Sequence, residues 1–368
     1  MLAPALTPLA ASLPETVPFI GPETLERRSG RLFRARLGAN ESSFGPAPSA
    51  IAAIAEAGPE AWKYCDPDMF DLRTALASHC RVASDEVAIG EGIDGLLGLC
   101  VRLFAAPGEA VVSSIGAYPT LNYHIAGFGA DLHAVPYRDD REDLDGLLAA
   151  VRQTGARLVY LANPDNPMAS WWPAEAVTAF ADALPAQTLL LLDEAYGEFA
   201  PPGTVPPIDT SRPNMLRLRT FSKAYGLAGI RCGYTIGPAR LIGAFDRVRN
   251  HFGVGSITQA AAIAALADQD HLQSVLQQTA LAKARIADIA FDNSLQPLPS
   301  ATNFVTIDCG RDGTFALAIL NGLAERGVFI RKPMAPGLDR CIRITAGTGD
   351  QLDVLQEALP QALASARS

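Results

Sequence analysis

The chain of 368 residues is 49% hydrophobic and 19% charged, so it is long and apolar enough to bury the cores of two domains and is not a disordered protein. Its formal net charge is −9, and no run of lysines or arginines supplies the basic face that a nucleic-acid-binding protein needs. No apolar run reaches the ~20 residues of a transmembrane helix, so the sequence predicts a soluble acidic enzyme that does not bind membranes.

Short β-branched or leucine-rich runs alternate with helical patterns from about residue 48 onward. The runs lie at residues 86–90, 110–114, 158–162 and 189–192. This alternation predicts an α/β fold with a mostly parallel sheet covered by helices on both faces. Ligands bind beyond the carboxyl ends of the strands in such sheets, which is where four polar residues fall: Asn163, Asn166, Asp193 and Ser222.

The last part of the chain predicts a smaller α+β unit. A short strand at 232–236 precedes a helical region from Pro238 and a long alanine-rich helical stretch around 258–290. Strand-like segments at 304–308, 328–331 and 341–345 follow, together with a helix near 314–326 and a final helix. These later elements are expected to leave the large sheet and form a second domain.

Lys223 stands among small residues, with Ser222 before it and Arg231 eight positions later. A lysine amine becomes a useful nucleophile when burial or nearby cations lower its pKa, which is the setting of a Schiff-base lysine. Asp193, at the end of a buried strand, can pair with a protonated ring nitrogen. A lysine with an acidic partner for a pyridinium nitrogen is what pyridoxal phosphate (PLP) requires.

Further residues fit the same cofactor. Asn166 and Tyr196 can donate hydrogen bonds toward the phenolate oxygen of PLP. The turn that contains Gly92, Ile93 and Asp94 can open a helix, so that its free backbone N–H groups meet a phosphate. The Ser222 hydroxyl and the Arg231 charge are expected to complete the phosphate site.

The chain resembles the aspartate-aminotransferase-fold (fold type I) PLP enzymes, and within them most resembles the histidinol-phosphate aminotransferases. The resemblance covers nearly the whole chain. Its segments occur in the family's order at 37–46, 62–64, 92–97, 118, 163–167, 193–196, 222–223, 231–234 and 342–348. The resemblance implies a large PLP-binding domain at residues 45–250 and a small domain made of residues 1–44 and 251–368.

The resemblance also assigns roles. Lys223 is expected to carry the cofactor and to move the substrate Cα proton, with Asp193 and Tyr196 as its catalytic partners. Tyr118 falls where the family stacks an aromatic ring on the cofactor. Tyr64 corresponds to a tyrosine that reaches the phosphate in the neighbouring subunit, which implies a homodimer with shared sites.

Three residues match the family's substrate-binding positions: Asn40 at the entrance, Arg343 as the carboxylate clamp and Arg331 as a second anion-binding arginine. The planar fork of an arginine suits bidentate pairing with an anion. Departures from the family pattern occur at Ile93, at Cys65-Asp66 after Tyr64, and at Met168-Ala169 after Asn166-Pro167.

The expected reaction exchanges an amino group between the glutamate/2-oxoglutarate pair and imidazole-acetol phosphate. Glutamate gives up the amino group and becomes 2-oxoglutarate, and imidazole-acetol phosphate accepts it. An aromatic amino acid aminotransferase and a threonine-phosphate decarboxylase-like lyase remain alternatives, because a few pocket contacts decide between them. A PLP-binding regulator is disfavoured, because the chain has no spare basic DNA-binding domain. A dinucleotide-binding enzyme is disfavoured, because no Gly-x-Gly-x-x-Gly turn follows the first strand.

The six cysteines form no C-x-x-C pair and no metal-ligand spacing with the five histidines. The sequence therefore predicts no metal site. Reduced thiols and the lack of a signal-peptide pattern favour a cytoplasmic location.

Overall fold

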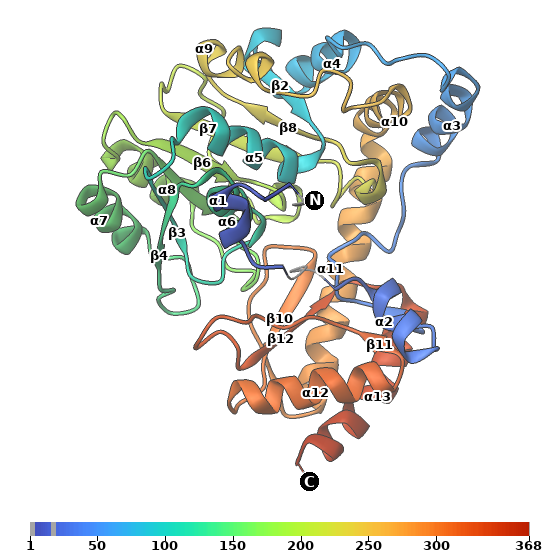
Figure 1. The fold of residues 1–368 in the computed structure, drawn as a ribbon. Coiled ribbons are helices and arrows are strands. Elements are labelled where there is room, and N and C mark those ends of the chain that lie inside the picture. The colour runs from blue at the N-terminus through green and yellow to red at the C-terminus, as the bar shows by residue number, and fades with distance from the viewer. Residues whose placement is uncertain (1–3, 16–19, 368) are drawn as a thin grey trace.

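The computed structural model describes residues 4–15 and 20–367. A seven-stranded sheet occupies the larger part of the molecule, and a smaller group of strands and helices lies below it in Figure 1. The sheet runs in the order β2 (Val87–Gly90), β8 (Gly233–Ile236), β7 (Met215–Thr220), β6 (Leu189–Asp193), β5 (Leu158–Ala162), β3 (Ala110–Ser114) and β4 (Asp131–Val135).

The pairing within this sheet is parallel from β7 through β4, and only β8 is antiparallel to its two neighbours. The predicted α/β fold with a mostly parallel sheet is therefore confirmed. Strands β4 and β7 of this sheet were not predicted, because neither lies within a run that the sequence pattern identified.

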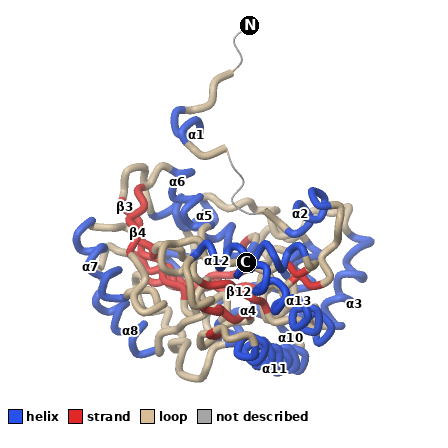
Figure 2. The backbone as a smooth tube through the Cα atoms, turned by 90° about the horizontal axis from the view of Figure 1, so that it is seen from below, coloured by secondary structure: helices blue, strands red, loops and turns tan. Residues whose placement is uncertain are grey.

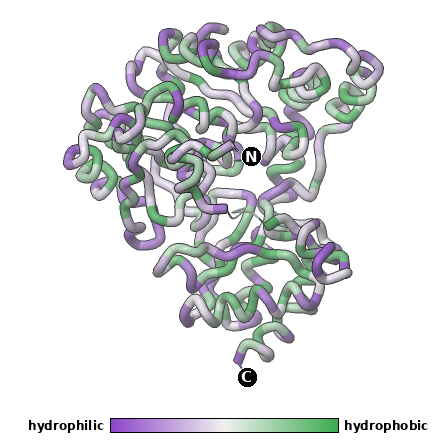
Figure 3. The backbone as a smooth tube through the Cα atoms, viewed as in Figure 1, coloured by the Kyte–Doolittle hydropathy of each residue, from purple (hydrophilic) through white to green (hydrophobic). Residues whose placement is uncertain are grey.

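Helices cover both faces because the central strands are apolar on both faces. Side chains alternate along a strand, so Leu158 and Leu191 pack with α5 (Gly92–Phe104) and α6 (Thr120–Phe128). Val159 and Leu190 face the other way, toward α7 (Leu144–Thr154) and α8 (Ala174–Ala183). Along the chain, hydrophobic and hydrophilic stretches alternate in the helices (Figure 3), as expected for helices that bury one side.

Four further helices accompany the large sheet. The helix α10 packs against α3 and α4 in a common apolar cluster. Their bounds are α3 (Pro48–Ala57), α4 (Phe70–Cys80), α9 (Ala239–Ile242) and α10 (Ser256–Ala267).

The smaller group contains a three-stranded antiparallel sheet and a parallel pair of short strands. In the sheet, β10 (Phe304–Asp308) lies between β12 (Cys341–Thr345) and β9 (Gln296–Pro297). In the pair, β1 (Ala35–Arg36) lies beside β11 (Val328–Phe329), so the N-terminal segment joins C-terminal elements. The division at residues 44/45 and 250/251 stays a prediction.

Helices α11 (Gln269–Asp292), α12 (Gly313–Glu325) and α13 (Gly349–Arg367) pack around these strands in one apolar core. The predicted helical stretch 258–290 is two helices, because Asp268 interrupts it and its side chain caps α11 by accepting a hydrogen bond from the His271 N–H at 3.0 Å. Figure 1 shows α11 running from beside α10 into the smaller group.

Two short helices precede β1. Helix α2 (Pro22–Ser29) lies beside the smaller group, and α1 (Pro8–Ser12) lies outside the main body (Figure 2). Among the described residues, none of the helices combines the length and the apolarity needed to cross a bilayer.

Candidate active site

The parallel topology brings the main predicted residues to one edge of the sheet. Strands β5, β6 and β7 are adjacent and end together. Asn166 follows β5, Asp193 is the last residue of β6, and Lys223 follows β7. Residues of the smaller group complete the site from the other side.

Lys223 is partly buried against the N-terminal segment. Its Nζ donates a hydrogen bond to the backbone carbonyl of Asn40 at 3.1 Å and lies 5.7 Å from the centre of the Tyr196 ring. Burial, and then the positive charge of Arg343, lower the pKa of Lys223 to about 8. The neutral amine is therefore still the minor form near physiological pH, but it is far more populated than in an ordinary lysine, which favours a role as nucleophile or base.

Asp193 is buried, with 5% of its surface exposed. The Tyr160 hydroxyl donates to its Oδ2 at 2.7 Å and the Ala195 N–H donates to its Oδ1 at 2.9 Å. Burial raises the pKa of Asp193 to about 6, and the two hydrogen bonds oppose that rise. Within the described part of the chain Asp193 forms no ion pair, so this buried carboxylate fits a cationic ring nitrogen from outside the protein.

Asn166 and Tyr196 are oriented by neighbours. Arg343 Nη1 donates to Oδ1 of Asn166, which leaves the Asn166 amide hydrogens for another acceptor. Asn40 Nδ2 donates to the Tyr196 hydroxyl at 2.9 Å, which leaves the phenol hydrogen free to be donated. Burial raises the pKa of Tyr196 to about 12, so it stays a donor. Both groups suit a phenolate oxygen.

The predicted phosphate site is assembled at the start of α5. Arg231 Nη2 lies 3.3 Å from Asp94 Oδ2, and its Nη1 lies 3.4 Å from the Ser222 hydroxyl. Gly92 has φ +76°, and a Cβ there would meet Arg231 Nη2 at 2.6 Å. Ile93 is buried in the core under α5, which explains how its bulk is accommodated. Backbone donors, a hydroxyl and a guanidinium thus meet in a cradle that a side chain at Gly92 would fill.

Replacing Gly92 by alanine is expected to weaken PLP binding by about tenfold. The left-handed backbone costs a β-carbon roughly 1–2 kcal/mol, and the new methyl group would displace the Arg231 guanidinium. Titration of PLP into the cofactor-free protein measures the loss. Gly127→Ala in α6 is the matched control, because a Cβ there meets nothing within 4 Å. Equal affinities for the two variants would contradict the placement of the phosphate.

Tyr118 lies beside this cradle. It is partly buried against the core cluster of α5, and burial together with the Asp94 carboxylate raises its pKa well above the usual range. Its position next to Asp94 is compatible with stacking on the cofactor, which stays a prediction.

The substrate-binding predictions meet on the other side. Arg331 and Arg343 exchange two backbone hydrogen bonds, of 3.2 and 2.7 Å. Arg343 Nη2 donates to the Gly38 carbonyl at 3.0 Å, and Arg331 Nη2 donates to the Ile20 carbonyl at 2.6 Å. Asn40 has φ +56° and lies buried between Tyr196 and β12. Asn40 and Arg343 therefore contact Tyr196 and Asn166, and Arg331 lies next to Arg343.

Tyr64 is the predicted site residue that the fold does not bring to the others. Its ring is 85% exposed and stands 4.9 Å from the Phe252 ring. Nearby Trp62 is 78% exposed. Within one chain Tyr64 therefore has no part in the site, and its predicted role depends on a second subunit.

Several contacts of the site were missed by the sequence reasoning. Thr345 and Asn303 fix Asn40: Asn40 N–H donates to the Thr345 hydroxyl at 3.1 Å, and Asn303 Nδ2 donates to the Asn40 carbonyl at 3.1 Å. Tyr160, which donates to Asp193, was also missed. A single tyrosine inside an otherwise aliphatic strand was the available signal for Tyr160; Asn303 and Thr345 carried none.

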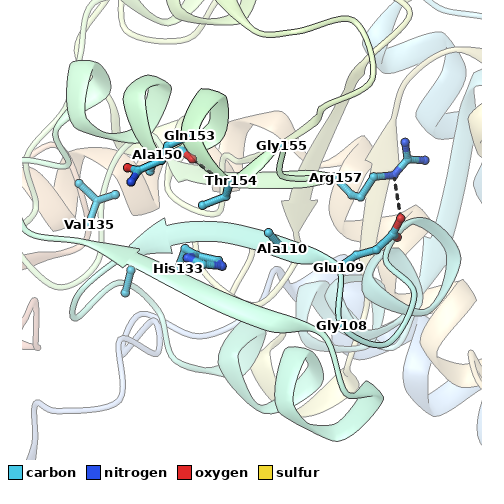
Figure 4. A pocket seen from close by; sticks show the side chains of 11 residues that line it. Gly108, Glu109, Ala110, His133, Val135, Ala150, Gln153, Thr154, Gly155 and Arg157 are labelled. Carbon is cyan, nitrogen blue, oxygen red and sulfur yellow. Dashed lines mark hydrogen bonds and ion pairs between the residues drawn. The ribbon is translucent and has the colours of Figure 1, made fainter.

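A groove of about 750 Å³ lies elsewhere, beside the starts of β3 and β5 and the end of α7 (Figure 4). Glu109 and Arg157 form an ion pair of 3.7 Å at one end of it, and His133 is among the residues that line it. None of the predicted site residues lines this groove. It is distinct from the site at the carboxyl ends of the strands.

The fold and the site define a fold type I pyridoxal-phosphate enzyme. Residues 35–359 match the family described as aminotransferase class I and II. The chain belongs to this aminotransferase family, which confirms the predicted family, cofactor and class of reaction: the protein is a PLP-dependent transaminase.

Relatives are consistent with this assignment. The chain is 36% identical to histidinol-phosphate aminotransferase 1 of Nitrosococcus oceani over 92% of both chains. It is 36% identical to histidinol-phosphate aminotransferase 2 of Pseudomonas fluorescens over 89% of both chains. The crystal structure of histidinol-phosphate aminotransferase from Sinorhizobium meliloti in complex with pyridoxal-5'-phosphate is similar with a TM-score of 0.96 and 57% identity, over 98% of both chains.

Proposed function

We propose that the protein transfers an amino group between glutamate and imidazole-acetol phosphate, giving 2-oxoglutarate and L-histidinol phosphate. The observation that supports this proposal most is the cation in the site. The Arg343 guanidinium donates to Asn166 Oδ1 and to the Gly38 carbonyl, it forms no ion pair with a described carboxylate, and its buried Nε has no hydrogen-bond partner. A partly buried guanidinium without a carboxylate partner is costly unless an anion from outside completes it. The substrate carboxylate or phosphate supplies that anion. The names of the relatives point to histidinol phosphate.

PLP, when bound, supplies the electron sink that stabilises negative charge at the substrate Cα. The chain's own residues do the rest in this proposal. Lys223 Nζ would take the proton from the substrate Cα and pass it to the cofactor. Asp193 would hold the ring nitrogen as an ionised carboxylate, and Asn166 and Tyr196 would donate toward the phenolate oxygen. Arg343 would hold the substrate anion and so orient the substrate relative to Lys223.

The experiment that tests the function is an absorption titration of the PLP-loaded protein. L-glutamate, L-histidinol phosphate, L-phenylalanine and L-threonine phosphate are added separately. Conversion of the lysine-bound cofactor band to the band of pyridoxamine phosphate by glutamate and histidinol phosphate is the expected result. Conversion by phenylalanine with no response to histidinol phosphate would identify an aromatic aminotransferase instead, and carbon dioxide release from threonine phosphate would identify a lyase.

We propose in addition a homodimer with shared sites. Exposed aromatic side chains around Tyr64 support it: Trp62, Tyr64 and Phe70 are 78%, 85% and 68% exposed. Mixing a Lys223→Ala protein with a Tyr64→Ala protein is expected to restore activity, because a hybrid dimer holds one site with both side chains intact. A fully active monomer in sedimentation experiments would contradict the proposal.

A cytoplasmic location belongs to the same proposal. The six cysteines are all free thiols and all buried. Free thiols are typical of a reducing compartment.

A further inference from the structure

The side chain of Tyr160 is the one aromatic residue in β5, whose other members are Leu158, Val159, Leu161 and Ala162. It is 1% exposed. Its ring packs on the α5 side of the sheet, and its hydroxyl donates a 2.7 Å hydrogen bond to Asp193 Oδ2. No transamination step described above uses this hydroxyl.

The strand register explains why the contact forms. In the parallel pair β5–β6, Tyr160 lies beside Leu191, and Ala162 lies beside Asp193. Tyr160 and Asp193 therefore share one face of the sheet and are offset by two residues, or roughly 6–7 Å along the strands. A tyrosine that leans along the strand spans this offset with its hydroxyl, whereas the leucines of the same strand are too short and have no donor.

We propose that Tyr160 is a positioning residue that orients the Asp193 carboxylate and keeps it ionised for the cofactor ring nitrogen. The inference rests on the proposed role of Asp193 in the PLP site. Tyr160 is too deep in the sheet to face substrate, and it acts through Asp193.

The charges around Asp193 explain why such a donor is needed. Asp94 from α5 and Glu194 from its own strand end both raise the pKa of Asp193, and burial does so most strongly. Glu142 and Tyr196 also lie within electrostatic reach of the Asp193 carboxylate. The opposing groups are two donors, Tyr160 O–H and Ala195 N–H. Each occupies one carboxylate oxygen, so the plane of the group is fixed.

The test compares Tyr160→Phe with Tyr234→Phe. Tyr234 is also 1% exposed, lies in β8 of the same sheet, and belongs to a different apolar cluster. The PLP dissociation constant of each cofactor-free protein is measured between pH 5 and 9. For Tyr160→Phe we expect binding about tenfold weaker at neutral pH. Because loss of the donor raises the pKa of Asp193, the acid-side fall in PLP binding moves to higher pH by about one unit. Tyr234→Phe is expected to match the parent protein in both.

A double-mutant cycle with Asp193→Asn separates a positioning role from a general effect on folding. If Tyr160 acts through Asp193, the Tyr160→Phe change has no further effect on PLP affinity in the Asp193→Asn protein. An equal loss in both backgrounds, or an unchanged affinity and pH profile for Tyr160→Phe, would overturn the inference while leaving transamination by the parent protein intact. Failure of the parent protein itself to bind PLP would instead overturn the proposed function and the inference together.

Discussion

Replacement of Lys223 by alanine is expected to lower turnover by about 10⁴-fold or more, because one change removes both the proposed covalent anchor and the proposed base. The structure supports a single amine in both roles. Lys223 Nζ lies at the carboxyl edge of the sheet, 3.1 Å from the Asn40 carbonyl and 5.7 Å from the centre of the Tyr196 ring. The measurement is the rate of the half reaction with glutamate, followed by cofactor absorption.

Lys283 provides a matched control for this experiment. Lys283 lies on α11 and is also a partly buried lysine, and burial lowers its pKa to about 8. Its Nζ, however, donates to the Ser300 carbonyl at 2.9 Å. Lys283→Ala is expected to keep turnover within a few-fold of the parent protein. Wild-type transamination by the Lys223→Ala protein would show that another amine carries the cofactor.

Local sequence patterns predicted the parts of the fold that rest on apolar periodicity. Strands β5 and β6 were predictable because every residue in each is buried, so β5 and the four leucines of β6 appear as continuous apolar runs. Strand β7 was missed because Arg217 and Arg219 interrupt its apolar pattern. Glu194 compensates the charge of both arginines within the sheet by forming ion pairs with Arg217 at 2.6 Å and with Arg219 at 2.9 Å. The compensating charge is more than twenty residues away, so no local window contains it.

The same distinction applies to the site. Asp193 follows a strand-like run and was predictable as a functional polar group at a strand end. Lys223 follows β7, which the pattern missed, and was predictable instead from the small residues around it and from Ser222 and Arg231 nearby. The groups that orient them come from far along the chain: the Thr345 hydroxyl, which holds Asn40, is 305 residues away from it. Such pairings depend on tertiary packing between the two groups of elements. The exposed Tyr64 shows the opposite case, in which a resemblance predicted a role that a single chain cannot display.

Substitutions of Arg343 are expected to produce the second large loss. Arg343→Lys keeps the positive charge but loses the planar fork that binds Asn166 and that we propose binds a substrate anion. Arg343→Gln loses both. We expect kcat/KM for glutamate to fall by about 100-fold or more in each, since truncating one member of a buried charge pair costs roughly 2–5 kcal/mol. Steady-state kinetics measure the fall, and Arg331→Gln is expected to lose less, because its Nη2 donates to the Ile20 carbonyl.

The pair of Arg343 variants also separates the fork from the charge through the titration of Lys223. The positive charge of Arg343 disfavours the protonated form of the nearby amine and so lowers the pKa of Lys223, which is about 8 in the intact protein. Removing that charge in Arg343→Gln is expected to raise the pKa of Lys223, so that PLP capture by the cofactor-free protein requires a higher pH. Arg343→Lys retains a cation and is expected to leave the midpoint of PLP capture close to that of the parent protein. An unchanged midpoint in Arg343→Gln would mean that burial and Arg231 lower the pKa of Lys223 without Arg343. Equal kcat/KM values for the parent and both variants would remove Arg343 from the substrate site.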